Sequence, residues 1–416
     1  MVSLSSGRLA IAGGRPVRVA PWPTYDKGDV FVHEEDELAV HAALRSRLYF
    51  RYDRRPIGET ETGQFEAALC RLFGVPHALA LSSGTAAITV ALMGLDLPPG
   101  SQVACPGFAF PATPSAILMA GLEPLLVEVD EHLNFDVEDL YRRAGPRLAA
   151  IVVVHMRGMA SDVEGVLAAA GELGVPVVED AVPALGVRVG ERHVGTFGAA
   201  GAFSTQSDKS INTGEGGFLI TSDPELYTRA IILSGAYEGR HRQHPGIVDG
   251  ISHLDLPLYN FRMDELRAAF ARAQLRRLPE HLLRQRENYA TIVDGLHDVP
   301  GIVIRHPAAV GGWLGECLVF RVPGGAASWF ARALRREGIE ARNFGDPGEA
   351  NVRCFWNWRF LFDTRDPDAI KARLPRTACL LEEAIDVPLA PTLGPADCED
   401  VVLAIQKVAA GLDAAD

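Results

Sequence analysis

Short apolar segments alternate with helix-length amphipathic segments along the chain from about residue 77 onward. Each apolar segment is bounded by glycine, proline or aspartate, and most are apolar at consecutive positions. Strands that are covered on both faces have this composition, and their alternation with helices is typical of β-α-β units. The pattern therefore predicts an α/β fold, a mostly parallel sheet with helices on both faces. Its expected strands are residues 77–83, 101–106, 123–129, 149–156, 175–180, 201–205 and 217–222.

The pattern changes after Asn260. Residues 263–296 are strongly helical in pattern, with arginine on the polar face. A smaller α+β domain is expected beyond about residue 300, from strand-like segments at 301–306 and 316–323 and helical segments at 326–338 and 399–412. The first 60 residues read as an extended arm followed by a helix at 35–47. The predicted organisation is an N-terminal arm and helix (1–60), a large domain (61–290) and a small C-terminal domain (291–416).

Composition and charge restrict the class of protein. The 416 residues are 48% hydrophobic and 22% charged, as in a globular protein, and the formal net charge is −13. No run of lysine and arginine interleaved with aromatic residues is present, so we do not expect a nucleic-acid partner. No apolar run approaches the roughly 18 residues that span a bilayer, and the first residues lack the apolar core of a signal peptide. We therefore expect a cytoplasmic protein with no membrane partner.

Cysteine and histidine give no sign of a metal site. The six cysteines are scattered without a CxxC pair, which suits a reducing compartment. The zinc-protease, P-loop and dinucleotide-binding motifs are absent. His241 and His244 have no third ligand nearby, and the basic segment 235–246 that holds them is expected to be a solvated loop, or else a loop that closes over a substrate.

Polar and aromatic residues cluster at the ends of the predicted strands. They include Ser83-Gly84-Thr85, Phe110, His155, Glu179-Asp180 and Ser204-Lys209. In open α/β sheets, ligands bind at the carboxyl ends of the strands. The sequence therefore predicts that these residues line one site.

Lys209 and Asp180 suggest the chemistry of that site. A lysine amine that is held in a pocket forms a Schiff base with the aldehyde of pyridoxal phosphate, and this cofactor needs a carboxylate at its ring nitrogen. Lys209 stands on a glycine-rich turn and Asp180 ends the strand VPVVED, so the pair fits both needs. Taken singly, a solvated lysine is the more common reading of Lys209, and a turn or capping aspartate is the more common reading of Asp180.

A phosphate group requires backbone N–H groups and hydroxyls at a helix start. Gly84 and Thr85 fit this requirement, because they follow a strand and begin the helical segment TAAITVALMGL. A simple helix cap uses the same residues. Ser204 adds a hydroxyl that serves either the phosphate or a backbone group.

The order of these motifs resembles one family. From about residue 8 to 410 the chain is similar to the sugar and aminocyclitol aminotransferases of fold-type I, the DegT/StrS type, which use pyridoxal phosphate. The resemblance rests on GGxPVR, SSGTAAI, CPGFAFPAT, VHMRG, VVEDA, FS followed by the lysine and GEGG, and YNFRM.

The resemblance implies a role for each residue. It makes Lys209 the Schiff-base lysine and Asp180 the partner of the ring nitrogen, with Gly84, Thr85 and Ser204 as phosphate contacts. Phe110 would stack on the cofactor, although a core position is the simpler reading for a phenylalanine. Asn260 would reach the phosphate from the neighbouring subunit, which implies a homodimer with shared active sites.

Two positions depart from the family pattern. Pro183 stands where many relatives have a glutamine or histidine that contacts the ring oxygen of the cofactor. Arg157 replaces an aromatic residue, and it is expected either to bind a substrate carboxylate or phosphate or to form a surface ion pair. The aromatic segment at 354–360 is expected to pack in the core or a dimer interface, or to form a wall over the substrate entrance.

The expected function is transamination from glutamate or glutamine to the ketone of a sugar, cyclitol or related small molecule, in secondary-metabolite or surface-sugar biosynthesis. One alternative is a pyridoxal-phosphate-binding regulatory protein without turnover. The other is a dehydratase or other lyase on the same fold. Relatives that dehydrate sugars carry histidine at the lysine position, so Lys209 favours the aminotransferase.

Overall fold

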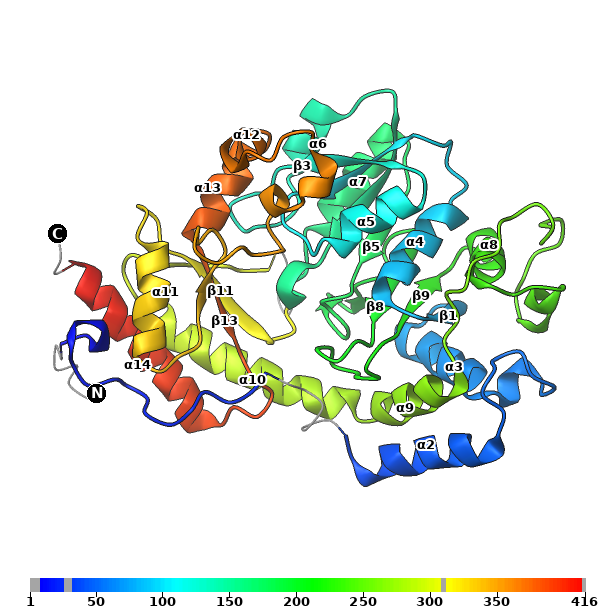
Figure 1. Cartoon of the computed structure of the whole chain (residues 1–416), viewed down its shortest axis with the longest axis horizontal. Helices are drawn as coiled ribbons and strands as arrows, with labels where there is room; N and C mark the ends of the chain where they lie inside the picture. Colours follow the sequence, from blue (N-terminus) through cyan, green and yellow to red (C-terminus); the bar gives the residue numbers. More distant parts are fainter. Residues whose placement is uncertain (1–7, 26–31, 308–311, 414–416) are drawn as a thin grey trace.

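A seven-stranded sheet forms the centre of the larger part of the molecule. The computed structural model describes residues 8–25, 32–307 and 312–413 (Figure 1). The strand order is β1-β9-β8-β5-β4-β2-β3, and β9 is antiparallel to both of its neighbours while the other pairings are parallel. The strands are β1 (His77–Leu81), β2 (Gln102–Pro106), β3 (Glu123–Val127), β4 (Leu148–Val154), β5 (Val177–Asp180), β8 (Ala200–Ser204) and β9 (Gly217–Thr221). Each predicted segment overlaps one strand, and β4 and β8 begin one residue earlier than predicted, so the predicted mostly parallel sheet is confirmed.

Helices cover both faces of this sheet. Consecutive residues of its central strands are apolar, so each face presents apolar side chains that must be buried against a helix. Val152 packs in a core with residues of α4, α5 and α8, whereas Ile151 and Val153 pack in another core with residues of α7. Residues of α3 and α9 form a third core against β1, β8 and β9. The helices are α3 (Glu61–Phe73), α4 (Gly84–Gly94), α5 (Ala112–Met119), α6 (Val137–Arg143), α7 (Val163–Leu173), α8 (Pro224–Ser234) and α9 (Glu265–Leu275).

A smaller antiparallel sheet lies in the C-terminal part, in the order β10-β11-β13-β12. Its strands are β10 (Val303–Ile304), β11 (Cys317–Arg321), β12 (Arg342–Asn343) and β13 (Ala384–Pro388), and the nearby helices are α10 (Leu278–Leu296), α11 (Ala327–Arg336), α12 (Pro367–Lys371), α13 (Pro375–Glu383) and α14 (Pro395–Asp413). Phe320 and Phe330 pack with residues of α10 and α14 in the core of this part. The predicted α+β character of this region is confirmed.

The remaining elements are short. A two-stranded hairpin pairs β6 (Arg188–Val189) with β7 (Arg192–His193). The 3-10 turns are η1 (Ala10–Ala12), η2 (Ile57–Glu59), η3 (Met156–Gly158), η4 (Arg240–Gln243), η5 (Phe355–Asn357) and η6 (Arg359–Leu361).

The long helical segment predicted at 263–296 is two helices. They are α9 and α10, which follow one another from the large sheet to the small one (Figure 1). Pro279 lies in the first turn of α10, where its missing N–H is tolerated, but a continuous helix would need that N–H for the ladder. The predicted domain boundary at residue 290 falls inside α10, so the division into two domains stays a prediction.

The N-terminal arm is fastened to the small sheet and its helices, while α2 (Glu34–Ser46) packs against α9. The buried Glu337 carboxylate accepts hydrogen bonds from the Ala10 N–H at 2.8 Å and the Val17 N–H at 3.0 Å, and it pairs with Lys407. Arg18 forms an ion pair with Asp397 at 2.6 Å. The arm is therefore held by charged hydrogen bonds at its backbone and does not rely on apolar packing alone.

The segment at 235–246 is not the solvated loop that we expected. His241 and His244 are only 4% and 3% exposed. Nε2 of His244 lies 2.9 Å from the Tyr52 hydroxyl and Nδ1 lies 3.2 Å from the Tyr227 hydroxyl. Burial lowers the pKa of His244 well below its usual value, so the ring is neutral and serves as a link between two tyrosines.

Neither a membrane-spanning helix nor a metal-ligand cluster is found in the described ranges. No helix among them combines the length and the apolar character needed to cross a bilayer. The same ranges contain no group of three or more histidine, cysteine or acidic side chains that could hold a metal ion.

Glu179 fixes the carboxyl end of β5 to the segment 195–198. Its fully buried carboxylate accepts hydrogen bonds from the N–H groups of Gly195, Phe197 and Gly198 at 2.6 to 2.8 Å. It also lies 3.0 Å from Nε2 of His155, whose Nδ1 accepts from the Ser161 N–H. Since Nδ1 is the acceptor, Nε2 carries the proton and donates to Glu179.

We predict that Glu179→Ala lowers the free energy of unfolding by at least about 3 kcal/mol, because several buried donors lose a charged acceptor. Thermal and urea denaturation measure the change. Glu191→Ala is the control, since Glu191 is exposed and its removal should change stability by less than about 0.5 kcal/mol. Equal stability of the two variants would contradict this account of β5.

Candidate functional site

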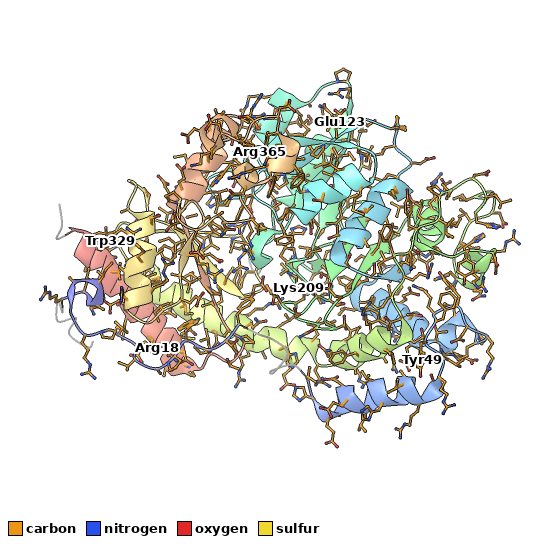
Figure 2. All side chains as sticks on the ribbon, viewed as in Figure 1. Arg18, Tyr49, Glu123, Lys209, Trp329 and Arg365 are labelled. Atoms are coloured by element: carbon orange, nitrogen blue, oxygen red, sulfur yellow. The ribbon has the colours of Figure 1, made fainter. Side chains whose placement is uncertain are left out.

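A cavity of about 330 Å³ lies at the carboxyl ends of the central strands. It is bounded by the large sheet on one side and by residues of the C-terminal part on the other. Figure 2 shows Lys209 near the middle of the molecule, between these two parts. Six of the seven predicted cofactor-binding residues line this cavity: Gly84, Thr85, Phe110, Asp180, Ser204 and Lys209.

Asp180 ends β5, and its carboxylate is buried at the floor of the cavity. The residue is 4% exposed. Its Oδ2 accepts a hydrogen bond from the Thr113 hydroxyl at 2.6 Å, and its Oδ1 accepts one from the Val182 N–H at 3.2 Å. Burial raises the pKa of Asp180, while these hydrogen bonds and the positive charge of Lys209 act in the opposite direction. The site therefore holds a carboxylate that a further positive partner would stabilise.

His155 and Glu179 do not line the cavity, contrary to our expectation. Successive side chains of a strand point to opposite faces of the sheet. Since Asp180 faces the cavity, Glu179 faces the helices on the other side and binds His155 there. Glu179 thus stabilises the fold, whereas Asp180 lines the cavity.

Lys209 is placed by a closed loop between β8 and β9. The Thr205 N–H donates to the Gly216 carbonyl at 2.9 Å, and the Thr213 N–H donates to the Thr205 carbonyl at 2.8 Å. Gly216 has φ +155°, and a Cβ there would lie 2.3 Å from Thr205 Oγ1, so the second glycine of GEGG is required. Within the loop, the Lys209 N–H donates to the Gln206 carbonyl at 2.9 Å, which turns the half-buried lysine toward the cavity.

The start of α4 offers an anion site. The Ser83 hydroxyl caps the helix by accepting from the Ala86 N–H at 3.0 Å, so the cap reading is correct for Ser83. The first N–H groups of a helix have no partner within it, which leaves those of Gly84 and Thr85 at the cavity. A Cβ on Gly84 would lie 2.8 Å from Val182 Cγ2 and 3.0 Å from Ser204 Cβ, so only glycine allows this close approach.

Ser204 and Phe110 complete the lining of the cavity on the side of the large sheet. The Ser204 hydroxyl accepts a hydrogen bond from the Gln206 N–H at 3.1 Å, so it serves a backbone group and still borders the cavity. Phe110 is 50% exposed, which rules out the core position considered from the sequence. An aromatic ring at the wall of a cavity is suited to stacking on a planar ligand.

Asn260 is the one predicted cofactor-binding residue that does not line the cavity of its own chain. It is exposed. The carbonyl of the next residue, Phe261, accepts a hydrogen bond from the Ser82 N–H at 2.8 Å. The backbone beside Asn260 is therefore bonded to the segment that directly precedes α4. Its predicted contact across a dimer is not tested by a single chain.

The C-terminal side of the cavity contains residues that sequence reasoning missed. Glu316 precedes β11, and Arg353 lies in the loop before η5; both line the cavity. Neither belongs to a strand end of the large sheet, so the rule that located the other residues carries no signal for them. Pro183 also lines the cavity and has no side-chain donor with which to replace the missing ring-oxygen contact.

Arg157 forms a buried ion pair, which corrects the expectation of a surface pair. Its Nη2 lies 2.8 Å from Oδ1 of Asp386 on β13, and both side chains are 9% exposed. The backbone of Arg157 has φ +57°, an uncommon value for a residue other than glycine. The guanidinium thus connects the end of β4 to the small sheet beside the cavity.

The aromatic segment at 354–360 is mainly a packing element. Phe355, Trp356 and Trp358 are buried in one core with Phe108 and Phe344. The core-packing interpretation is therefore confirmed for these three residues. Phe360 is 53% exposed and takes no part in that core.

Comparison with known proteins gives one family. The family model described as the DegT/DnrJ/EryC1/StrS aminotransferase family matches residues 33–406. A relative, the L-glutamine:2-deoxy-scyllo-inosose aminotransferase of Micromonospora echinospora, is 32% identical over 291 residues, which are 69% of this chain and 68% of that protein.

Solved structures have the same fold. An aminotransferase from Psychrobacter cryohalolentis has a TM-score of 0.78 at 25% identity, covering 95% of this chain and 99% of that one. An E. coli GDP-4-keto-6-deoxy-D-mannose-3-dehydratase with bound hydrated pyridoxal phosphate has a TM-score of 0.74 at 21% identity, covering 94% and 99%. Fold-type I is therefore confirmed, and pyridoxal phosphate is the cofactor of this fold family.

We predict that Asp180→Asn stabilises the cofactor-free protein at neutral pH. Burial raises the pKa of Asp180 in the folded state, so the ionised carboxylate opposes folding at pH above that pKa, and the penalty disappears below the unfolded value. The variant should therefore melt at a higher temperature than the wild type at pH 8, and the gap should close toward pH 4. Thermal unfolding across this pH range measures it.

Asp208→Asn is the matched control, because Asp208 lines the same cavity but is exposed. It should give no such pH-dependent gain. A lower melting temperature for Asp180→Asn at pH 8 would show that ionised Asp180 stabilises the empty fold.

Proposed function

This chain belongs to the DegT/DnrJ/EryC1/StrS aminotransferase family, and we propose that it transfers an amino group from glutamate or glutamine to the ketone of a sugar, a cyclitol or a related small molecule. The observation that carries the proposal is that Lys209, Asp180 and the start of α4 border one cavity. A lysine amine, a buried carboxylate and an anion site are the three groups that pyridoxal phosphate requires of a protein.

The residues of the cavity fit the cofactor group by group. Gly84 and Thr85 would hold the phosphate through their N–H groups, with the Ser204 hydroxyl beside them. Asp180 would bind the ring nitrogen and keep it protonated, which supplies the positive partner that its buried carboxylate favours. Phe110 would cover one face of the ring. When bound, the cofactor supplies an aldehyde that takes up the amino group and a ring that stabilises negative charge on the reacting carbon.

Lys209 would hold the cofactor and then act as acid and base. Once its Nζ is free, this amine could take a proton from the substrate carbon and deliver it to a carbon of the cofactor. The sequence has four lysines. Lys371 and Lys407 are paired with Glu382 and Glu337 away from the cavity, and Lys27 lies outside the described residues. Lys209 is thus the lysine that borders the cavity within the described ranges.

We further propose a homodimer whose subunits share their active sites. Asn260 would reach the phosphate held by the neighbouring chain. Leu254, Leu258 and Tyr259 are 82%, 55% and 37% exposed on the segment that leads to it, and exposed apolar residues of this kind favour burial against a partner.

The proposed setting is the cytoplasm, in the synthesis of secondary metabolites or surface sugars. All six cysteines are free, which suits a reducing compartment. The keto-cyclitol in the name of the Micromonospora relative, 2-deoxy-scyllo-inosose, supports the acceptor class.

Two other functions remain as alternatives. A dehydratase has the same fold, but Lys209 favours the aminotransferase, as the family resemblance implied. An experiment distinguishes the enzyme from a regulatory protein that binds the cofactor without turnover. Glutamate or glutamine added to the cofactor-loaded protein should change the visible absorbance of the cofactor, and the absence of change with any amino donor would refute the proposed function.

We predict that Lys209→Ala abolishes the covalent attachment of the cofactor by borohydride, because no other lysine of the described ranges borders the cavity. Mass spectrometry of the reduced protein gives the measurement. Lys371→Ala is the control and should be labelled as the wild type is. Labelling of Lys209→Ala at the wild-type level would show that Lys209 is not the residue that binds the cofactor covalently.

A second prediction concerns the phosphate site. Gly84→Ala places a Cβ against Val182 and Ser204, and overpacking of this kind costs about 1–3 kcal/mol. The backbone shift that relieves it would displace the N–H groups of Gly84 and Thr85, so we expect cofactor affinity to fall about tenfold. Gly171→Ala is the control, because a Cβ at Gly171 on α7 meets no atom within 4 Å. Titration with the cofactor compares them, and equal affinities would contradict a close approach at Gly84.

A further inference from the structure

The wall of the cavity that belongs to the C-terminal part contains a buried carboxylate, that of Glu316. The residue directly precedes β11, lines the cavity and is 4% exposed. Its carbonyl accepts a hydrogen bond from the Leu389 N–H at 2.9 Å, and the next residue, Cys317, pairs with Pro388 of β13. The small sheet therefore fixes the backbone from which this carboxylate extends.

The N-terminal arm supplies a hydrogen-bond donor to Glu316. The Tyr25 hydroxyl bonds to the Glu316 carboxylate, and burial together with the adjacent negative charge raises the pKa of Tyr25 well above its usual value. The tyrosine is therefore neutral and donates its proton. An ionised carboxylate has two oxygens and about four positions that accept hydrogen bonds. A carboxylate that accepts from Tyr25 can thus accept from hydroxyl groups of a ligand as well.

Positive and negative charges balance on this wall. Arg157 and Arg353 both line the cavity, and Arg157 forms an ion pair with Asp386 at 2.8 Å while its charge also attracts that of Glu316. Burial and the like charge of Arg157 lower the pKa of Arg353, whereas the negative charge of Asp386 opposes this shift. Arg305 lies behind the wall, donates to backbone carbonyls and does not line the cavity. Two guanidinium groups of the wall thus stand beside two carboxylates.

The charged residues on the opposite side of the cavity are mainly acidic. Asp208 and Glu215, on the loop between β8 and β9, line the cavity and are exposed. Asp180 and Lys209 serve the cofactor in the proposed function. The lining that remains for a substrate therefore carries more negative than positive charge within the described ranges. Such a lining repels a ligand that bears phosphate groups, but it does not repel an uncharged ligand that offers hydroxyl groups.

We propose that Glu316 binds hydroxyl groups of the keto acceptor, and that this acceptor is a polyol ketone without a phosphate group, a keto-cyclitol or a free keto sugar. The inference rests on the proposed function and narrows its acceptor class. Two neighbouring hydroxyls of a polyol can donate to the two oxygens of one carboxylate, and hydrogen bonds to a charged acceptor are the stronger ones. Tyr25 is then a positioning residue, which orients the Glu316 carboxylate through its hydroxyl.

The two half-reactions separate the acceptor from the donor. Glutamate or glutamine first converts the cofactor-loaded protein to its amino form; the donor is then removed, a ketone is added, and the return of the original visible absorbance is followed. Three ketones are compared: scyllo-inosose, which is a keto-cyclitol; cyclohexanone, which is the same ring without hydroxyls; and the nucleotide-linked ketone GDP-4-keto-6-deoxymannose. The wild type should be half-saturated by scyllo-inosose at a concentration roughly 10- to 100-fold below that of cyclohexanone. The GDP-linked ketone should react no better than cyclohexanone.

Glu316→Gln should raise the half-saturating concentration of scyllo-inosose by roughly 10- to 100-fold, the range for lost hydrogen bonds to a charged group. The donor concentration needed in the first half-reaction should stay the same, which a general disturbance of the wall would not allow. Tyr25→Phe removes only the positioning hydroxyl and should raise the scyllo-inosose value about two- to tenfold, the range for a neutral hydrogen bond. Glu349→Gln is the matched control, because Glu349 is exposed on the loop that holds Arg353 and does not line the cavity.

The visible absorbance of the bound cofactor verifies that each variant has a folded site, and if Glu316→Gln fails this check, the shift in Tyr25→Phe decides. Wild-type half-saturation by scyllo-inosose in Glu316→Gln would overturn the assignment of Glu316. An amino form that does not prefer scyllo-inosose to both other ketones would overturn the acceptor class, while the donor half-reaction would still support the proposed function. A wild type whose absorbance changes with no donor would instead refute the proposed function together with this inference.

Discussion

The buried carboxylate of Asp180 is the constraint on which the site depends. It stands at the end of a central strand, where burial opposes its charge and only a few groups support it. The sheet can hold such a group because the adjacent Glu179 secures the same strand end from the other face with charged hydrogen bonds. Stability on one side of β5 thus permits an energetically unfavourable group on the other, which is the usual condition of a preorganised site.

The strands, and the half of the site that lies on the large sheet, follow from local sequence pattern. Buried parallel strands are apolar at consecutive positions, and ligand-binding residues come directly after them, so Gly84, Phe110, Asp180 and Lys209 were found from the sequence. The same rule failed for His155 and Glu179, because one residue of register decides which face of the sheet a side chain takes.

The other half of the site follows from contacts between distant segments. Arg353 and Glu316 reach the cavity only because the small sheet packs over the strand ends, and no local pattern marks them. The Arg157–Asp386 pair joins residues 229 positions apart. His244 is similar, since its burial depends on Tyr52, which lies 192 positions away in the chain, as well as on the nearer Tyr227. Tertiary packing determines these positions, and neither residue propensity nor residue spacing in the sequence predicts such packing.

The fastening of the N-terminal arm has a consequence for the handling of the protein. Glu337 and Arg18 hold the arm so that it ends with the Tyr25 hydroxyl against Glu316, at the boundary of the cavity. The described part of the arm, residues 8–25, thus connects the helices of the small sheet to the wall of the cavity. Proteolytic removal of residues 8–25 would therefore disturb the wall of the cavity as well as the fold, although these residues lie far from Lys209 in the sequence.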